Sequence, residues 1–376
     1  SDPVSGDQSW EKVISKNLGL DLNMLNNRLS LTADFYIRDT KGILGTGKKL
    51  PSIYGAKEPQ VNSNDLRTKG YELVLGWRDS FKLAGSTFSY GITGSFSDYT
   101  AKYIKCDNPS GLINQPYVGQ KYGEIWGYKV DGLFRSDEEA AEYASRIDLS
   151  TVAAGYYSAT GAYGKGVRAG DIKYLDLDGN NIVNGGNGTL EDPGDRRVIG
   201  NSSPRYQYGL TLNFSWYGFD LSVFMQGIGR LDWYPGADNL RFWGPYSRPY
   251  ATFVPKNFMS QVWSESNPDA YFPRARAYTS LNASQGTAYY TNDRYLQNLA
   301  YCRLKNLTIG YTIPKRLTSK VGIKECRVYF SGENLATWTA LKSDFLDPEQ
   351  AAADSDKKSN VYPWCKTYSV GLNLTF

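Results

Sequence analysis

The sequence predicts an all-β fold whose long antiparallel strands cross a membrane as part of a β-barrel. Three observations lead to this prediction: apolar and polar residues alternate over long segments, short and long connections alternate between those segments, and aromatic residues are abundant. The 376 residues include 30 Tyr, 15 Phe and 9 Trp, and aromatic side chains form girdles at both edges of the lipid-facing band of membrane barrels. No apolar run approaches the roughly 18 to 20 residues that a membrane-spanning helix needs.

About nine segments show the period of two that places successive side chains on opposite faces of a sheet. They are centred on residues 18–24, 29–37, 71–77, 88–96, 206–216, 219–225, 307–311, 328–330 and 368–376. In the last segment, Tyr368, Val370 and Leu372 share one face, whereas Ser369 and Gly371 lie on the other. We expect strands of about ten or more residues, which is longer than usual in globular sheets and fits a tilted membrane crossing.

The connections between these segments fall into two classes that alternate along the chain. The short ones are residues 25–27, 80–85, 217–218 and 313–323, and the long ones are residues 43–65, 105–203, 231–298 and 339–362. Bacterial outer-membrane barrels show this pattern, with short turns in the periplasm and long loops outside. We therefore expect extracellular long loops. Because a complete single-chain bacterial barrel has an even number of strands, an odd number predicts the C-terminal part of a longer barrel.

The main alternative for the alternating segments is a soluble β-sandwich, in which the apolar faces of two sheets pack against each other. Such a fold would suit a glycan-binding module and would be soluble without detergent. Strand length, the segregation of the connections and the aromatic residues near strand ends favour the membrane barrel.

The composition excludes several kinds of function. The 42 Lys and Arg against 38 Asp and Glu give a net charge of +4, which is too small to indicate a nucleic-acid partner. The absence of His excludes Ser-His-Asp and Cys-His catalysis and His-ligated zinc. The four cysteines form no CxxC pair. Hydrolysis by two carboxylates is the remaining enzymatic alternative, but no pair has a supporting motif, so we expect no enzymatic activity.

One acidic turn has the pattern of a calcium-binding loop. Asp176, Asp178 and Asn180 supply oxygen atoms at the first, third and fifth positions of that pattern. The sixth position is Asn181 in place of Gly, and Asn tolerates the left-handed backbone that such a turn needs. Asp195 is the candidate closing ligand. We expect no required cofactor. The loop is a candidate site for a structural Ca²⁺, and the alternative is an Asp/Asn/Gly-rich turn without an ion.

Two of the long loops concentrate aromatic residues together with arginines. The candidate substrate-binding residues are Trp126, Tyr128, Trp233, Tyr234, Arg241, Phe242, Trp243 and Tyr246, with Tyr250 beside them. Aromatic faces stack on sugar rings or pack against peptide side chains. Loops of this length must also bury side chains to be ordered, and for any individual aromatic residue this core role is the favoured interpretation. Arg241, Arg248, Arg274 and Arg276 suit either an anionic substrate or pairing with nearby carboxylates.

The end of the chain resembles a barrel-assembly signal. Gly371, Leu374 and the terminal Phe376 follow the polar, Gly, apolar and aromatic pattern by which outer-membrane barrels are recognised for assembly. Beyond this ending, nearly the whole chain resembles the C-terminal barrel region of SusC/RagA-type TonB-dependent transporters. The matching stretches are residues 10–12, 27–29, 70–73, 170–174, 198–201, 218–222, 304–311, 333–335 and 347–349.

This resemblance implies a barrel of 22 strands, of which the strands here would be the last, in the outer membrane of a Gram-negative, Bacteroidetes-like bacterium. It also implies an N-terminal plug domain and a TonB box outside this sequence. The family imports oligosaccharides or oligopeptides, with a SusD-like lipoprotein as a lid and with energy delivered by TonB through the plug. The implied partners are therefore the rest of the same transporter, the lid, TonB, membrane lipid and the substrate. A passive porin or adhesin barrel, without plug or TonB dependence, remains open as an alternative.

Overall fold

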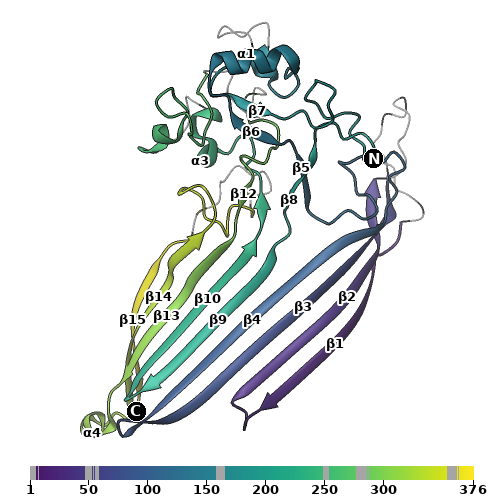
Figure 1. Ribbon diagram of the computed structural model, residues 1–376. Coiled ribbons are helices and arrows are strands. Elements are labelled where there is room, and N and C mark those ends of the chain that lie inside the picture. Colours follow the sequence, from purple (N-terminus) through teal and green to yellow (C-terminus); the bar gives the residue numbers. More distant parts are fainter. Residues whose placement is uncertain are drawn as a thin grey trace.

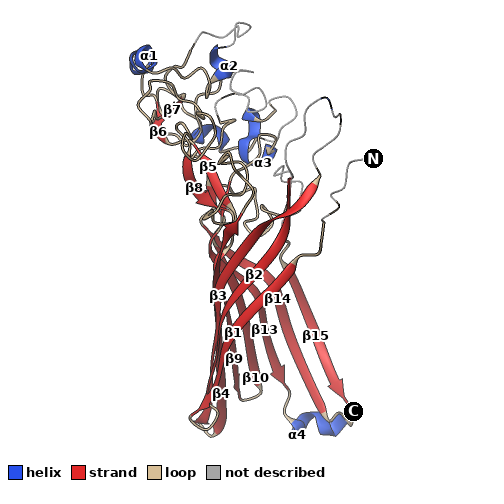
Figure 2. Ribbon diagram, turned by 90° about the vertical axis from the view of Figure 1, so that its right-hand side faces the viewer, coloured by secondary structure: helices blue, strands red, loops and turns tan. Residues whose placement is uncertain are grey.

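The computed structural model describes residues 6, 8–46, 53, 55, 59–157, 166–248, 254–276, 286, 288–353, 362 and 364–376. Its main feature is one curved sheet of nine tilted strands (Figures 1 and 2), in which every neighbouring pair is antiparallel. In spatial order the strands are β1 (Lys12–Met24), β2 (Leu29–Thr46), β3 (Gln60–Leu83), β4 (Ser86–Lys105), β9 (Arg205–Trp216), β10 (Phe219–Arg230), β13 (Tyr301–Thr312), β14 (Glu325–Thr339) and β15 (Thr367–Thr375). The predicted all-β class and the nine strands are confirmed.

Strands β2, β3 and β4 extend further than the apolar alternation predicts. Paired residues such as Ile43 and Asn64 continue the sheet into the predicted loop 43–65, so that only residues 47–59 connect β2 to β3. The turn predicted at 80–85 shrinks to Ala84 and Gly85, whose φ angles of 48° and 83° suit a two-residue hairpin turn. The prediction missed these extensions because backbone groups need partners even where side chains are polar. Strand β15 has nine residues, one fewer than the expected minimum.

The apolar residues of the nine strands gather on one face of the sheet, which we call the outer face. Directly paired residues share a face, and the pairing runs from Leu29 to Trp77, on to Ile92 and Leu212, and then to Val223. This row crosses five adjacent strands without a change of face. The strand phase predicted from the sequence is therefore consistent across the sheet.

The outer face is not covered by other parts of the described chain. Leu18 is 72% exposed, Phe35 and Leu75 are each 53% exposed, and Leu372 is 57% exposed. A soluble sandwich would bury this face under a second sheet. An apolar face that spans a whole sheet and stays exposed is instead the surface that a membrane barrel presents to lipid.

The opposite, inner face is polar and is held together by contacts between neighbouring strands. Asp220 on β10 and Arg327 on β14 form an ion pair of 2.5 Å across the intervening strand β13. They pass over Gly310, where a Cβ atom would lie 2.5 Å from both side chains. In the same way the Tyr36 ring covers Gly70, where a Cβ atom would lie 2.5 Å from the ring. Glycine at these positions lets a long side chain lie flat on the strand.

The long connections fold into one body at one end of the sheet (Figure 1). We call the described parts of residues 106–204, 231–300 and 340–353 the loop assembly. It contains the two-stranded pairs β5 (Glu124–Gly127) with β8 (Arg197–Asn201), β6 (Val130–Leu133) with β7 (Ile172–Tyr174), and β11 (Asp232–Trp233) with β12 (Gln297–Asn298). Its helices are α1 (Asp137–Arg146), α2 (Ala154–Tyr157) and α3 (Leu240–Trp243), with 3-10 turns at Gly244–Tyr246 and Phe258–Gln261.

The short connections lie at the opposite end of the sheet. One of them carries helix α4 (Lys315–Thr318) and a 3-10 turn at Ser319–Val321, between β13 and β14 (Figure 2). Within the described residues, no helix combines the length and apolarity that a membrane span requires. The large cluster of buried apolar side chains, from Tyr128 to Ala351, lies in the loop assembly and not in the sheet.

Candidate functional site

Most of the aromatic residues predicted to bind substrate lie inside the core of the loop assembly. Tyr128, Trp233, Tyr234, Phe242, Trp243 and Tyr246 are between 1% and 7% exposed. The Trp243 ring meets Phe242 and Tyr295 edge to face, with centroids 4.7 and 5.0 Å away. These side chains therefore offer little surface to a ligand, although Tyr128 and Phe242 also line cavities. The core role explains their position, because loops of this length need buried apolar area to be ordered. Tyr250 lies outside the described residues.

Two of the loop arginines pair with local carboxylates. Arg248 Nη2 lies 3.4 Å from Asp238, and Arg276 Nη1 lies 2.5 Å from Asp171. Arg274 lies over the Trp263 ring, 5.1 Å from its centroid. These arginines therefore stabilise the loop assembly, whereas the predicted substrate contact Arg241 reaches a cavity.

That cavity lies where two long loops meet, and it has a volume of about 350 Å³. Arg241 and Lys342 line it from the two loops, together with Asp344 and the ring of Tyr271. The Lys342 ammonium sits 5.0 Å from the centroid of that ring. The cavity thus combines cations with an aromatic face, which are groups that recognise polar ligands.

Trp126 and Tyr128 line a second cavity of about 340 Å³. Its other walls are Tyr290, Arg196 and the glycine-rich segment 185–188. Arg196 donates to the Gly185 carbonyl at 2.7 Å, which holds the glycine-rich segment beside the aromatic side chains. Trp126 is half-buried, so among the predicted substrate contacts it keeps accessible ring surface.

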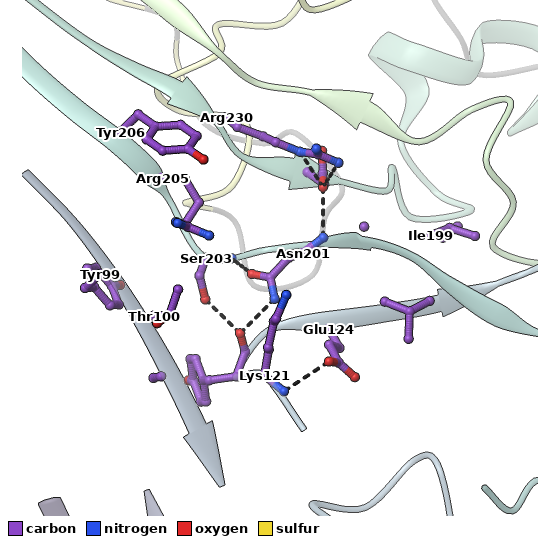
Figure 3. Close-up of a pocket in the computed structure, with 15 residues that line it drawn as sticks. Tyr99, Thr100, Lys121, Glu124, Ile199, Asn201, Ser203, Arg205, Tyr206 and Arg230 are labelled. Atoms are coloured by element: carbon purple, nitrogen blue, oxygen red, sulfur yellow. Dashed lines mark hydrogen bonds and ion pairs between the residues drawn. The ribbon is translucent and has the colours of Figure 1, made fainter. Parts of the chain in front are cut away.

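A third cavity, also of about 340 Å³, lies where the loop assembly joins the sheet (Figure 3). Asn201 connects three segments there: its backbone N–H donates to Asp232 at 2.8 Å, and its side-chain amide donates to the Tyr122 carbonyl at 3.0 Å. Arg230 also donates to Asp232. The chemistry-bearing residues of this cavity were not predicted from the sequence. The only signal was the stretch 198–201, which resembles the transporter family.

Glycine in that stretch has a steric cause. A Cβ atom at Gly200 would lie 2.8 Å from Leu296 and 2.9 Å from Asp232. Both distances are shorter than non-bonded contacts of real Cβ atoms. Strand β8 can therefore approach β11 closely only with glycine at this position.

The structure brings three of the four predicted metal ligands together. Oxygen atoms of Asp176, Asp178 and Asp195 lie within 4.8 Å of one another. Asp195 is fully buried and accepts the backbone N–H groups of Leu177 at 2.6 Å and Asn184 at 2.8 Å. Asp176 accepts the N–H of Asn181, whose φ of 66° is the predicted left-handed conformation. Asn180 points its side-chain oxygen back to the Ile182 N–H at 2.7 Å. A cluster of carboxylate oxygens is chemically suited to a hard cation.

A buried ion pair joins the two longest loops. The Asp171 carboxylate is fully buried and accepts the Arg168 backbone N–H at 2.8 Å and the Arg276 guanidinium at 2.5 Å. Arg276 also stacks on Tyr156, with 4.2 Å between the guanidinium carbon and the ring centroid. Burial raises the pKa of Asp171 from 3.8 to about 6, and Arg276 opposes this shift only in part.

We expect this carboxyl group to make the loop assembly less stable as pH rises from about 4 to about 6. The folded state binds the proton more tightly than the unfolded state, so the stabilisation is full below pH 3.8 and is lost through about pH 6. Thermal unfolding of the loop assembly, followed across this range, should show a component that Asp171→Asn removes. Identical pH profiles for the two proteins would contradict the assignment.

No protein-family model matches the chain. Among curated proteins, the chain is 25% identical over 398 residues to TonB-dependent receptor P3 of Formosa agariphila, covering 100% of this chain and 35% of that protein. It is 24% identical over 376 residues to TonB-dependent receptor SusC of Bacteroides thetaiotaomicron, covering 98% of this chain and 32% of that protein. The chain thus spans about a third of the length of these relatives.

Solved structures with the same fold come from the RagAB peptide importer. Its open-open state matches with a TM-score of 0.66 and 21% identity over 100% of this chain and 36% of that chain. Its closed-closed state matches with a TM-score of 0.65 and 22% identity over 98% of this chain and 36% of that chain. The sequence and structure matches together confirm the predicted resemblance, the barrel fold class and the location in the outer membrane.

Proposed function

We propose that this chain, which is similar over its whole length to SusC/RagA-type TonB-dependent transporters, forms barrel wall and external loops of such a transporter. The observation that carries the proposal is a sheet with one exposed apolar face, whose long connections gather at one end. In this arrangement the outer face meets lipid, the polar inner face lines the lumen, and the loop assembly stands outside the cell. The chain acts without enzymatic chemistry.

The proposed cargo is an oligosaccharide or an oligopeptide that is too large for passive diffusion. The proposed partners are the remaining strands and plug of the same transporter, a SusD-like lipoprotein lid and TonB. Two observations support recognition of extended polar cargo: the cavities of the loop assembly pair aromatic rings with cations, and the inner face is polar. The relatives named RagAB import peptides, whereas the cavity chemistry suits both kinds of cargo.

Uptake by cells that carry the full-length transporter tests this proposal. Labelled oligosaccharides and oligopeptides should enter cells with the intact gene, and uptake should stop when TonB is deleted. Detergent extracts should yield the transporter together with a lipoprotein. Uptake that continues without TonB would favour a passive porin. A detergent-independent 42.0 kDa monomer would favour the soluble β-sandwich.

We also propose that the turn of Asp176, Asp178, Asn180 and Asp195 binds a structural Ca²⁺. Three converging carboxylates, one of them fully buried, support this. The ion would link the turn of residues 176–181 to the strand that begins at Arg197, which also begins the wall of the cavity at the sheet.

Calcium is expected to stabilise the loop assembly by about 2.7 kcal/mol at a free concentration of roughly 100 times the dissociation constant. The double variant Asp176→Asn, Asp178→Asn should lose this gain, measured as the shift of the thermal unfolding midpoint. Glu191→Gln is the matched control, because Glu191 is an exposed acid in the same loop. Two results would contradict a calcium site: an equal shift of the unfolding midpoint with Mg²⁺, or an equal shift with Ca²⁺ in the double variant.

A further inference from the structure

The outer face of strands β1 to β4 changes abruptly from apolar to basic toward the loop assembly. In one row, Leu18 pairs with Phe35 and Phe35 with Tyr71, so the row is apolar on β1 to β3 and meets Asp98 on β4. In the next outward-facing row, Lys16 pairs with Ile37 and Ile37 with Lys69. Beyond these rows, the same face is dominated by cations. We call the following set the basic belt: Lys12, Lys16, Lys41, Arg67, Lys69, Lys102 and Lys121.

Several cations of the basic belt stand directly opposite each other. Lys12 pairs with Lys41 across β1 and β2, Arg67 pairs with Lys102 across β3 and β4, and Lys102 is bridged to Lys121. Like charges at directly opposed positions of a sheet destabilise it, because their Cβ atoms are only about 4.5–5.5 Å apart. The row of Asp39, Arg67, Lys102 and Lys121 therefore holds three cations and one carboxylate, and an anion from outside the sheet would relieve the remaining positive charge.

The described chain supplies little of that counter-charge. Asp39 pairs with Arg67 at 2.7 Å, and Asp98 on the same face pairs with Arg205 at 2.5 Å. No ion pair within the described residues involves any of the six lysines of the belt, and each of them is exposed. At the opposite end of the same strands, Arg28 and Asp79 form an ion pair, so the two charges neutralise each other.

The strands at the other edge of the sheet expose aromatic side chains. Trp338 on β14 is 56% exposed and Tyr368 on β15 is 62% exposed. Aromatic side chains are the usual residues at a membrane–water interface. The larger group of exposed cations therefore lies on β1 to β4 and at Lys121, while Lys366 is an exposed cation directly before β15.

We propose that the basic belt binds the phosphate groups of lipid headgroups in the membrane leaflet at the long-loop end of the barrel. The belt continues directly from the lipid-facing apolar rows, so it lies at the level of the headgroups. Lysine side chains reach from such positions to the charged interface while their methylene stems stay on apolar surface. The belt residues on β1 to β4 face outward, so cargo that moves through the lumen does not meet them. Lys121 lies beside them and lines the cavity between the loop assembly and the sheet (Figure 3).

An acidic protein partner is the competing occupant, but the position favours lipid. A lid or cargo contacts the loop assembly and the lumen, whereas the belt adjoins surface that is already in contact with lipid chains. The inference depends on the membrane-facing outer face and is independent of the proposed cargo. If the uptake experiment fails, the lipid-binding proposal is unaffected. If the basic belt does not bind lipid, the transporter proposal is unaffected.

The test compares the full-length transporter with the triple variant Lys69→Gln, Lys102→Gln, Lys121→Gln in detergent micelles. The probe is phosphatidic acid, with phosphatidylcholine as the reference lipid, and bound lipid is counted by native mass spectrometry. The preference for phosphatidic acid should fall roughly 100-fold in the triple variant, on the scale of three lysines at an anionic surface. Added salt should weaken the wild-type preference.

Two further variants keep the test decisive. The matched control Lys315→Gln, Lys320→Gln, Lys324→Gln removes three exposed lysines at the opposite end of the sheet and should keep the preference. The charge-conserving variant Lys69→Arg, Lys102→Arg, Lys121→Arg should keep it too, which excludes misfolding as the cause of a loss.

Three results would overturn the proposal. The first is an equal preference in the wild type and the glutamine variant. The second is displacement of phosphatidic acid by inorganic phosphate at equal concentration, which would point to free phosphate and not to lipid. The third is unchanged lipid binding with loss of the co-purifying lipoprotein, which would identify the belt as a protein-docking surface.

Discussion

Replacing Arg303 by methionine is expected to destabilise the attachment of the last long loop by about 3–5 kcal/mol. The Arg303 side chain is only 2% exposed, and its guanidinium reaches Asp347 at 2.6 Å and Glu349 at 2.9 Å. Its Nε atom also donates to Thr337 on the neighbouring strand at 3.0 Å. Methionine keeps much of the length but leaves Asp347 without its ion-pair partner and Glu349 with Lys305 alone.

Protease cleavage within residues 340–353 and the thermal unfolding midpoint of the full-length transporter measure this effect. The compensated variant Arg303→Met, Asp347→Asn should regain much of the loss, because it removes the orphaned carboxylate and leaves Glu349 paired with Lys305. Lys305 also contacts Glu349 at 2.7 Å and stays unchanged in both proteins. A change below about 0.5 kcal/mol in the single variant would show that the network does not hold the loop.

Leu212→Arg should cost about 2–4 kcal/mol and reduce assembly of the barrel in the membrane. Leu212 lies on the outer face of β9, with Ile92 and Val223 as direct neighbours on either side. A guanidinium at this position would face hydrocarbon. Leu372→Arg, on the outer face of β15, should behave alike, because Leu372 is directly paired with Val328.

Thr211→Arg is the matched control for this prediction. Thr211 is the adjacent residue on the same strand and faces the lumen, where it pairs with Thr93 and Phe224. Water-accessible space on that side should accommodate the new side chain. The amounts of heat-resistant folded barrel in outer-membrane fractions compare the variants, and equal damage from Thr211→Arg and Leu212→Arg would refute the assignment of faces.

The positions and faces of the strands could be predicted from the sequence wherever contact with lipid requires apolar side chains. The register joins the predicted apolar positions of β9 and β10, such as Leu212 and Val223, on one face. It was insufficient for the upper parts of β3 and β4, where outward-facing positions such as Arg67 and Lys102 still pair as regular strand. The backbone requirement for hydrogen bonds continues past the membrane, whereas the side-chain signal ends with it.

The structure of the loop assembly could be predicted only in part, because it depends on which distant segments of the chain pack together. Asp176 and Asp195 are separated by 18 residues, yet the turn returns the chain so that their carboxylates meet, as the oxygen-rich pattern predicts. For Trp243 and Trp126, the sequence gives the same residue type in the same kind of loop. Trp243 is 1% exposed, whereas Trp126 lines a cavity. Burial depends on which loops pack together, and local composition carries no information about that.

The segregation of short and long connections also has a consequence for the order of folding. Strands joined by short connections form four hairpins, β1–β2, β3–β4, β9–β10 and β13–β14. β-Hairpins form within microseconds, because their strands are already close in the chain. The turns of β3–β4 and β9–β10 have only two residues, whereas the β13–β14 connection carries helix α4. The β4–β9 seam, in contrast, joins strands separated by the whole of residues 106–204, and its pairing covers only Ser89 to Ser97 on β4. We therefore expect the sheet to assemble as preformed hairpins, with the β4–β9 seam closing late and opening first under load.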